Sequence, residues 1–147
     1  MTTIEATTTH LIVSDADAAS AWYQKAFDAH ELNRVTLPDG RLIHVEVHIG
    51  PVALMLADEF PEHGALGPQG DAVLTNVFYL HTDDVDALWQ RAIDAGATPT
   101  RPLTDVFWGE REGQLRDPFG YRWGLTQKLR DVPIEEITRG AADAFTQ

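Results

Sequence analysis

The sequence contains no cysteine among its 147 residues, which excludes disulfide bridges, thiolate zinc sites, iron–sulfur clusters and cysteine nucleophiles. Basic residues are also scarce: 11 Lys and Arg stand against 23 Asp and Glu, and the formal net charge is −12. A chain of this charge repels phosphate, and its basic residues are scattered singly. We therefore expect neither nucleic acid nor a membrane surface as a partner.

Long apolar runs are missing as well, since no segment approaches the roughly 18 apolar residues of a membrane-spanning helix. Residues 1–10 are rich in threonine and carry Glu5 where a signal peptide has a basic start. These features predict a soluble cytoplasmic protein. Serine is limited to Ser14 and Ser20, neither in a Gly-x-Ser-x-Gly turn, and there is no glycine-rich phosphate loop, so nothing indicates nucleophilic catalysis.

The apolar residues that are present predict a folded core. Hydrophobic residues make up 44% of the chain and include four Trp and six Phe, which is too many for a disordered protein. A chain of this length forms one domain or two small modules.

The first half predicts the order β-α-β-β-β. Residues 10–13 are β-prone, and apolar residues recur at three- and four-residue spacing from Asp15 to Ala29, as in an amphipathic helix. Three further strands are predicted at Glu31–Thr36, Arg41–Ile49 and Val52–Ala57. Turn sequences rich in proline and glycine separate these three strands.

The second half repeats this order. Val73–His81 is β-prone and Val85–Ala95 has one apolar helical face. Further strands are predicted at Ala97–Thr100, Asp105–Trp108, Gly113–Leu115 and Tyr121–Thr126. Asp15 and Asp83, 68 residues apart, are the expected helix caps, and Trp22 and Trp89 lie 67 residues apart, so the offset between the halves is 67 or 68 residues. We interpret the chain as two copies of one unit.

The predicted fold class is α+β. Two βαβββ repeats, 7–58 and 72–128, form a curved, mostly antiparallel sheet with a concave pocket, and a linker rich in glycine and proline, 59–71, joins them. Together they make one domain, 1–128. In the tail, 129–147, Pro133 and the apolar spacing that follows predict a short C-terminal helix.

Three sets of residues resemble a known family. They are Val13-Ser14-Asp15 with Ala21–Phe27, Asp83–Ala87 with Ala95-Gly96-Ala97, and Asp117-Pro118-Phe119-Gly120 with Tyr121-Arg122-Trp123. From Thr8 to about Lys128, the chain resembles the vicinal oxygen chelate superfamily. This superfamily includes glyoxalase I, extradiol dioxygenases, fosfomycin-resistance enzymes and bleomycin-resistance binding proteins. The last motif is the most specific, and its surroundings resemble an uncharacterised glyoxalase-like subgroup.

The resemblance implies four metal-ligand positions, each a His, Glu or Gln on an inward strand face in the metal-dependent members. Here they fall near Thr8, Met55, Asn76 or Val77, and Gly124. Methionine is a poor ligand for such a site and glycine offers no side chain. We therefore expect no metal at these positions and no other cofactor.

A polar strand face is the main candidate site. His44, Glu46 and His48 alternate with apolar residues, so they share one face, and His10 lies on the inward face of the first strand. We predict that this face lines the pocket. Two alternatives stay open: the three polar side chains are simply solvated, or His10, Glu46 and His48 bind a metal ion.

The predicted function is metal-free binding of an aromatic or hydrophobic small molecule in the concave pocket, as in bleomycin-resistance-like proteins. The predicted ligand-binding residues are His10, His44, Glu46, His48, Met55, Asn76, Phe107, Trp108 and Trp123. The alternative is an enzyme, a glyoxalase-type lyase, isomerase or dioxygenase with a non-standard metal site. A third hypothesis is an interaction protein whose pocket is vestigial. The resemblance also implies a homodimer.

Overall fold

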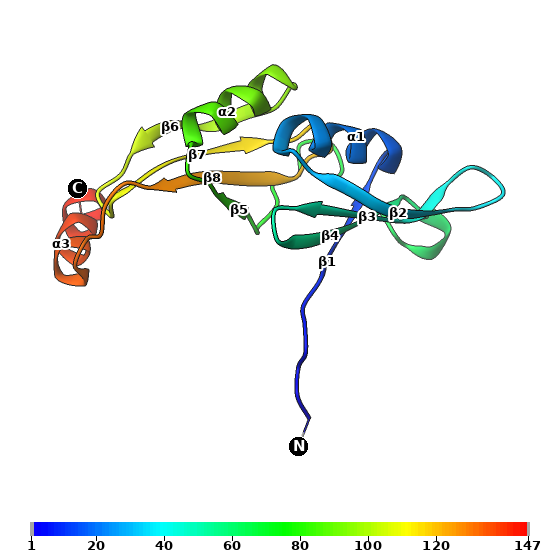
Figure 1. The fold of residues 1–147 in the computed structure, drawn as a ribbon, viewed down its shortest axis with the longest axis horizontal. Helices are drawn as coiled ribbons and strands as arrows, with labels where there is room; N and C mark the ends of the chain where they lie inside the picture. The colour runs from blue at the N-terminus through cyan, green and yellow to red at the C-terminus, as the bar shows by residue number, and fades with distance from the viewer. Residues whose placement is uncertain (1, 147) are drawn as a thin grey trace. The chain divides into compact units, whose positions relative to one another are not determined.

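The computed structural model describes residues 2–146, which divide into two compact units between Val73 and Leu74 (Figure 1). Each unit contains one four-stranded sheet and one helix that packs on it. The predicted α+β class and the order β-α-β-β-β are confirmed in both units.

Unit 1 builds its sheet in the order β1-β4-β3-β2. Its elements are β1 (Thr9–Val13), α1 (Ala16–Phe27), β2 (His30–Thr36), β3 (Leu42–Ile49), β4 (Val52–Asp58) and the 3-10 helix η1 (Pro61–His63). The outer strand β1 runs parallel to β4, and the other pairs are antiparallel. The first and last strands of the unit therefore lie side by side, although α1, β2 and β3 separate them in the sequence.

Unit 2 has the same topology, with the strand order β5-β8-β7-β6. Its elements are β5 (Phe78–His81), α2 (Val85–Asp94), β6 (Thr98–Asp105), β7 (Glu110–Arg116), β8 (Arg122–Lys128) and the C-terminal helix α3 (Ile134–Phe145). Again the outer strand, β5, is parallel to the last strand, β8. The C-terminal helix predicted after Pro133 is confirmed.

Alternation along the strands places the core of unit 1 between α1 and one face of the sheet. Val45 and Val47 of β3 and Leu56 of β4 are buried on this face. Tyr23 and Phe27 of α1 are buried as well, and their rings stack at 6.1 Å. The helix begins after Asp15, whose side chain accepts the Ala18 N–H, as expected for an N-cap.

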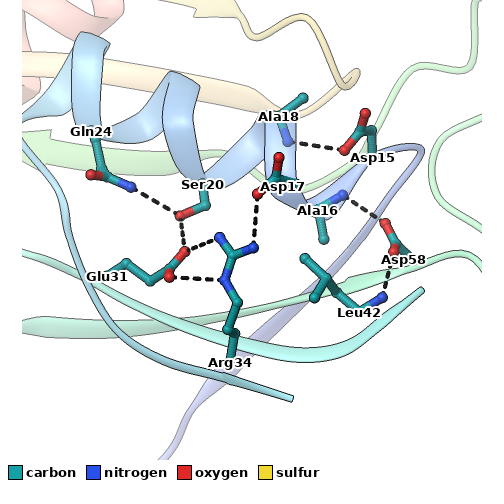
Figure 2. Close-up of polar contacts among 10 residues, drawn as sticks. All are labelled: Asp15, Ala16, Asp17, Ala18, Ser20, Gln24, Glu31, Arg34, Leu42 and Asp58. Carbon is teal, nitrogen blue, oxygen red and sulfur yellow. Dashed lines mark hydrogen bonds and ion pairs between the residues drawn. The ribbon is translucent and has the colours of Figure 1, made fainter. Parts of the chain in front are cut away.

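The side chains of Ser20 and Arg34 take part in hydrogen bonds that link α1 to β2 (Figure 2). Ser20 donates to Glu31 Oε1 at 2.7 Å, and Arg34 donates to both oxygens of the same carboxylate. These Arg34 hydrogen bonds lower the pKa of Glu31 despite its partial burial. Arg34 also reaches Asp17, so its guanidinium links β2 to the first turn of α1.

In unit 2 a glycine allows the helix to approach the sheet closely. A Cβ built on Gly113 of β7 would lie 2.7 Å from the Trp89 ring of α2. Leu115, next but one along the strand, and Leu125, which pairs with Gly113, are buried on the same face. This face, which carries α2, is therefore the core face of unit 2.

Three details of the second repeat differ from the sequence prediction. The N-cap of α2 is Asp84 rather than Asp83, and it lies 69 positions after its counterpart Asp15. The predicted strand at Asp105–Trp108 is wrong, since β6 ends at Asp105 and residues 106–109 form the turn to β7. The strand predicted at Ala97–Thr100 is confirmed in part, since β6 continues past Pro102 to Asp105, and its two prolines are tolerated because β6 is at the edge of its sheet.

The C-terminal helix α3 packs on the turn between β6 and β7. A Cβ on Gly140 of α3 would lie 2.5 Å from Cδ2 of Phe107, so the Phe107 ring rests against the α3 backbone.

Across residues 2–146, no helix combines the length and apolar character needed to span a bilayer.

Candidate functional site

Each sheet has a second face that points away from α1 or α2, named here the opposite face. In unit 1 a row of side chains crosses this face from strand to strand. His10 of β1 pairs with Met55 of β4, Met55 pairs with Glu46 of β3, and Glu46 pairs with Asn33 of β2. Four side chains with different chemistry are thus placed next to one another by register alone.

The polar triplet of β3 lies on this opposite face, as the sequence predicts. His44, Glu46 and His48 are half-buried, whereas Val45 and Val47 between them are fully buried beneath α1. His48 Nε2 lies 2.9 Å from Glu46 Oε2, which makes an imidazole–carboxylate pair. The alternation is confirmed, and contact with a ligand stays a prediction.

The structure does not assemble the metal ligands of the alternative hypothesis. His10 is two strands from Glu46, about 10 Å at the usual spacing of strands, and its Nε2 lies 3.3 Å from the Thr8 hydroxyl. Within residues 2–146, no group of three His, Asp or Glu side chains is arranged to hold a metal ion. Glu46 and His48 alone do not complete a zinc site.

The corresponding row in unit 2 has different chemistry. Tyr79 of β5 pairs with Gly124 of β8, Gly124 pairs with Gln114 of β7, and Gln114 pairs with Arg101 of β6. By register, Tyr79 corresponds to His10 and Gly124 corresponds to Met55 of unit 1.

The Tyr79 ring covers Gly124. A Cβ built on Gly124 would lie 2.4 Å from Tyr79 Cε1 and 2.6 Å from Cδ1 and Cζ, distances that carbon atoms do not adopt without displacement. A Glu, Gln or His at this position would therefore have to expel the ring. Together with the thioether at Met55, this packing shows that the residues present do not fit the four-ligand metal site that the resemblance implies.

A hydrogen-bond chain holds the hydroxyl end of Tyr79. Gln114 Nε2 donates to Tyr79 Oη at 2.7 Å, and Arg122 Nη2 donates to Gln114 Oε1 at 3.2 Å. Arg122 is fixed in turn by the Leu74 carbonyl, to which its Nη1 donates at 2.6 Å.

Two glutamates of β7 share the opposite face of unit 2 but differ in environment. Glu110 accepts the Trp108 indole N–H at 3.0 Å and the Thr126 hydroxyl at 3.1 Å. Glu112 is only 7% exposed, and in the described chain no donor contacts its carboxyl group. Burial, and then the charge of Glu110, raise the pKa of Glu112, while Arg101 and His81 act in the other direction.

The three predicted aromatic residues fall into different places. Trp108 is half-buried in the β6–β7 turn, where its ring meets the Phe107 ring edge-on at 4.8 Å. Trp123 is 2% exposed on the core face, where its indole N–H donates to Asp117 at 2.8 Å. Stacking of a ligand on Trp123 therefore has no support in the structure. Asn76 is exposed in the segment before β5.

Sequence reasoning missed the residues that fill the opposite face of unit 2. Tyr79, Gln114, Arg122 and Glu112 were not among the predicted site residues. One signal was present, because a glycine inside a strand often marks a place where another group approaches closely. Gly124 met this condition, but the strand pairing that puts Tyr79 over it is not visible in the sequence.

Comparison with known proteins identifies the family. Residues 4–125 match the model of the Glyoxalase/Bleomycin resistance protein/Dioxygenase superfamily. The chain belongs to this superfamily. An uncharacterised protein of Mycobacterium bovis is 44% identical over 131 residues, which cover 87% of this chain and 86% of that protein. An uncharacterised protein of Mycobacterium tuberculosis is also 44% identical over 131 residues, covering 87% and 77%.

Solved structures share the fold. TioX from Micromonospora sp. ML1 is 26% identical with a TM-score of 0.66, and the match covers 85% of this chain and 99% of TioX. A superfamily enzyme from Burkholderia phytofirmans is 19% identical with a TM-score of 0.67, covering 83% and 97%. Protein PA1353 from Pseudomonas aeruginosa is 22% identical with a TM-score of 0.67, covering 83% and 96%.

Proposed function

We propose that this superfamily member binds a small aromatic or hydrophobic organic molecule without a metal ion. The observation that supports this proposal is the packing of Tyr79 over Gly124. This packing leaves no space for a metal-binding side chain at a position where the resemblance implies one in the metal-dependent members. Met55, the corresponding residue of unit 1, offers a soft thioether rather than a carboxylate or imidazole.

Each unit, taken by itself, offers its opposite face as a candidate binding surface. In unit 1 it offers the imidazole–carboxylate pair of His48 and Glu46 beside the apolar Met55, a mixture of apolar area and few polar groups that is typical of ligand sites. In unit 2 the half-buried Trp108 supplies an aromatic ring. The net charge of −12 disfavours anionic ligands.

Metal analysis combined with a binding screen tests this function. Protein purified without a His tag is measured for bound metals, and a panel of neutral and cationic aromatic compounds is screened by thermal shift, then by calorimetry. We expect less than stoichiometric metal and at least one binder whose affinity is unchanged by a chelator. Stoichiometric metal together with binding that the chelator abolishes would contradict the proposal.

The second candidate is a glyoxalase-type lyase, isomerase or dioxygenase with a non-standard metal site. The Glu46–His48 contact at 2.9 Å is the observation that favours it. If this candidate is correct, His48→Ala lowers the metal content to background, whereas His63→Ala, an exposed histidine far along the chain in η1, leaves it unchanged.

The homodimer implied by the superfamily is likewise proposed. Light scattering of the purified chain measures its mass in solution, and a monomer at micromolar concentration would contradict this part of the proposal.

A further inference from the structure

We propose that the Tyr79 hydroxyl donates a hydrogen bond to an oxygen of the bound molecule. This inference rests on the proposed function, since it names the group that the bound molecule must offer. It is carried by the contacts of Tyr79 with Gly124, Gln114 and Arg122 in unit 2.

Arg122 sets the orientation of the Gln114 amide. A guanidinium group has only donors, so the atom of Gln114 that faces Arg122 Nη2 at 3.2 Å must be the amide oxygen. The bond from Arg122 Nη1 to the Leu74 carbonyl at 2.6 Å holds the guanidinium in this position. The amide nitrogen of Gln114 is consequently the atom that faces Tyr79.

The Gln114 amide in turn determines which way the Tyr79 proton points. The amide nitrogen only donates, so Tyr79 Oη accepts at 2.7 Å, and the single hydroxyl hydrogen of the phenol must point elsewhere. In the part of the chain that the structure describes, no acceptor contacts this hydrogen. The Tyr79 side chain is 39% exposed, so the hydrogen is directed toward accessible space on the opposite face.

The Tyr79 ring, rather than its hydroxyl, covers Gly124. Its carbons Cε1, Cδ1 and Cζ lie 2.4 to 2.6 Å from the point where a Cβ on Gly124 would be. The hydroxyl lies farther across the sheet, beside Gln114 of β7, which donates to it. Ring and hydroxyl thus occupy the opposite face of unit 2, where the bound molecule is proposed to lie.

The charges around Tyr79 have both signs. Glu110 and Glu112 occupy the same face of β7 as Gln114, while Arg101 pairs with Gln114 and Arg122 donates to it. The class of ligand therefore follows from the exposed ring and its hydroxyl donor rather than from net charge. It is an aromatic molecule with an acceptor oxygen, such as a carbonyl or amide oxygen.

A matched pair of probes isolates this hydrogen bond. 2-Acetylnaphthalene carries a carbonyl oxygen, and 2-ethylnaphthalene has nearly the same shape without it. Tyr79→Phe keeps the ring over Gly124 and removes only the hydroxyl. Calorimetry is expected to show about 3- to 10-fold weaker binding of the ketone in this variant, with the hydrocarbon unchanged.

A second variant keeps the Tyr79 hydroxyl but removes the Gln114 amide N–H that donates to it. In Gln114→Glu, the carboxylate still pairs with Arg122 and accepts the Tyr79 proton, which turns that proton away from the ligand. We expect the same selective loss of ketone affinity as in Tyr79→Phe. The carbonyl stretch of the bound ketone is expected at lower frequency in the wild-type protein than in either variant.

The outcomes separate this inference from the proposed function. If the wild-type chain binds both probes and the ketone-to-hydrocarbon ratio is the same in all three proteins, the donor role is overturned and small-molecule binding stands. If the wild-type chain binds neither probe nor any compound of the panel, the proposed function fails and this inference fails with it. A ratio that falls in both variants supports the donor.

Discussion

Asp58 accepts the backbone N–H of Ala16 at 2.7 Å, so the end of β4 closes the first turn of α1. In unit 2, Gln127 accepts the N–H of Val85 at 3.0 Å in the same way. Donor and acceptor are 42 residues apart in both cases. The duplication is thus preserved in the backbone contact, although a charged acceptor in one repeat is replaced by a neutral amide in the other.

The two acceptors are expected to differ in their contribution to stability. Asp58 also accepts the Leu42 N–H at 2.6 Å, so Asp58→Ala leaves two amides without a partner. We expect this change to lower the free energy of unfolding by about 2 to 4 kcal/mol and Gln127→Ala by about 1 kcal/mol. Urea denaturation measures both values. Equal losses would show that the second bond of Asp58 contributes nothing.

The overlap at Gly124 predicts a coupling between two substitutions. Gly124→Ala is expected to cost about 1 to 2 kcal/mol in the wild-type chain, because the added Cβ displaces the Tyr79 ring. In a Tyr79→Ala background the same change is expected to be neutral or stabilising, since alanine suits a strand interior better than glycine. A double-mutant cycle measures the coupling. Additive effects would mean that the ring moves aside without cost.

The buried carboxyl of Glu112 predicts a pH dependence. Its folded-state pKa is raised by burial and by Glu110, so the folded chain binds more protons than the unfolded chain above about pH 4. The extra proton binding means that the protonated carboxyl of Glu112 is tolerated better by the folded chain than the charged form. The contribution of Glu112 to the free energy of unfolding is therefore most favourable at low pH, and it falls as the pH rises through the folded-state pKa. Glu112→Gln, which does not ionise, is therefore expected to gain stability relative to the wild type from pH 4 to 7.

Denaturation of both proteins across this pH range measures that difference. Arg101 and His81 oppose the shift by attracting the Glu112 carboxylate, an attraction that is absent in Glu112→Gln, so they make the expected difference smaller without reversing it. A difference in stability that is constant from pH 4 to 7 would contradict the raised pKa.

Ligand binding is expected to change the fluorescence of Trp108. Its indole is half-buried in the β6–β7 turn and donates to Glu110, so a bound aromatic molecule at this face alters its surroundings. Trp123 is enclosed in the core and is expected to contribute no response. Titration of the wild type and of Trp108→Phe with a binder from the panel tests this. A response that persists in Trp108→Phe would place the ligand elsewhere.

The sequence predicts most of the strands because alternation and turn chemistry are local signals. His44, Glu46 and His48 were placed on one face correctly, since buried valines lie between them. The N-cap of α2 was predicted one residue too early, because Asp83 and Asp84 are adjacent and both are suitable N-cap residues. The first part of β6 was predicted at Ala97–Thr100, but its second part was missed because Pro102 is typical of a loop unless the strand is at an edge, which only the sheet order reveals.

The candidate site, like the fold, could be predicted from the sequence only in part. The loss of a ligand side chain at Gly124 is visible in the sequence, because it is a property of one residue. The identity of the group that covers it depends on which residue of β5 pairs with Gly124, and a shift of one position would put Phe78 there instead of Tyr79. Trp123 has a different reason: it is adjacent to Gly124 in β8, so the two residues face opposite sides of the sheet, and Trp123 lies on the core face.

The ring over Gly124 has an evolutionary consequence. A lineage with this arrangement gains no ligand by replacing the glycine alone, because the new side chain collides with the tyrosine. Replacing the tyrosine first uncovers a gap in the sheet surface with nothing to fill it. A metal-binding side chain at this position therefore requires two substitutions, and each single substitution is disfavoured by itself.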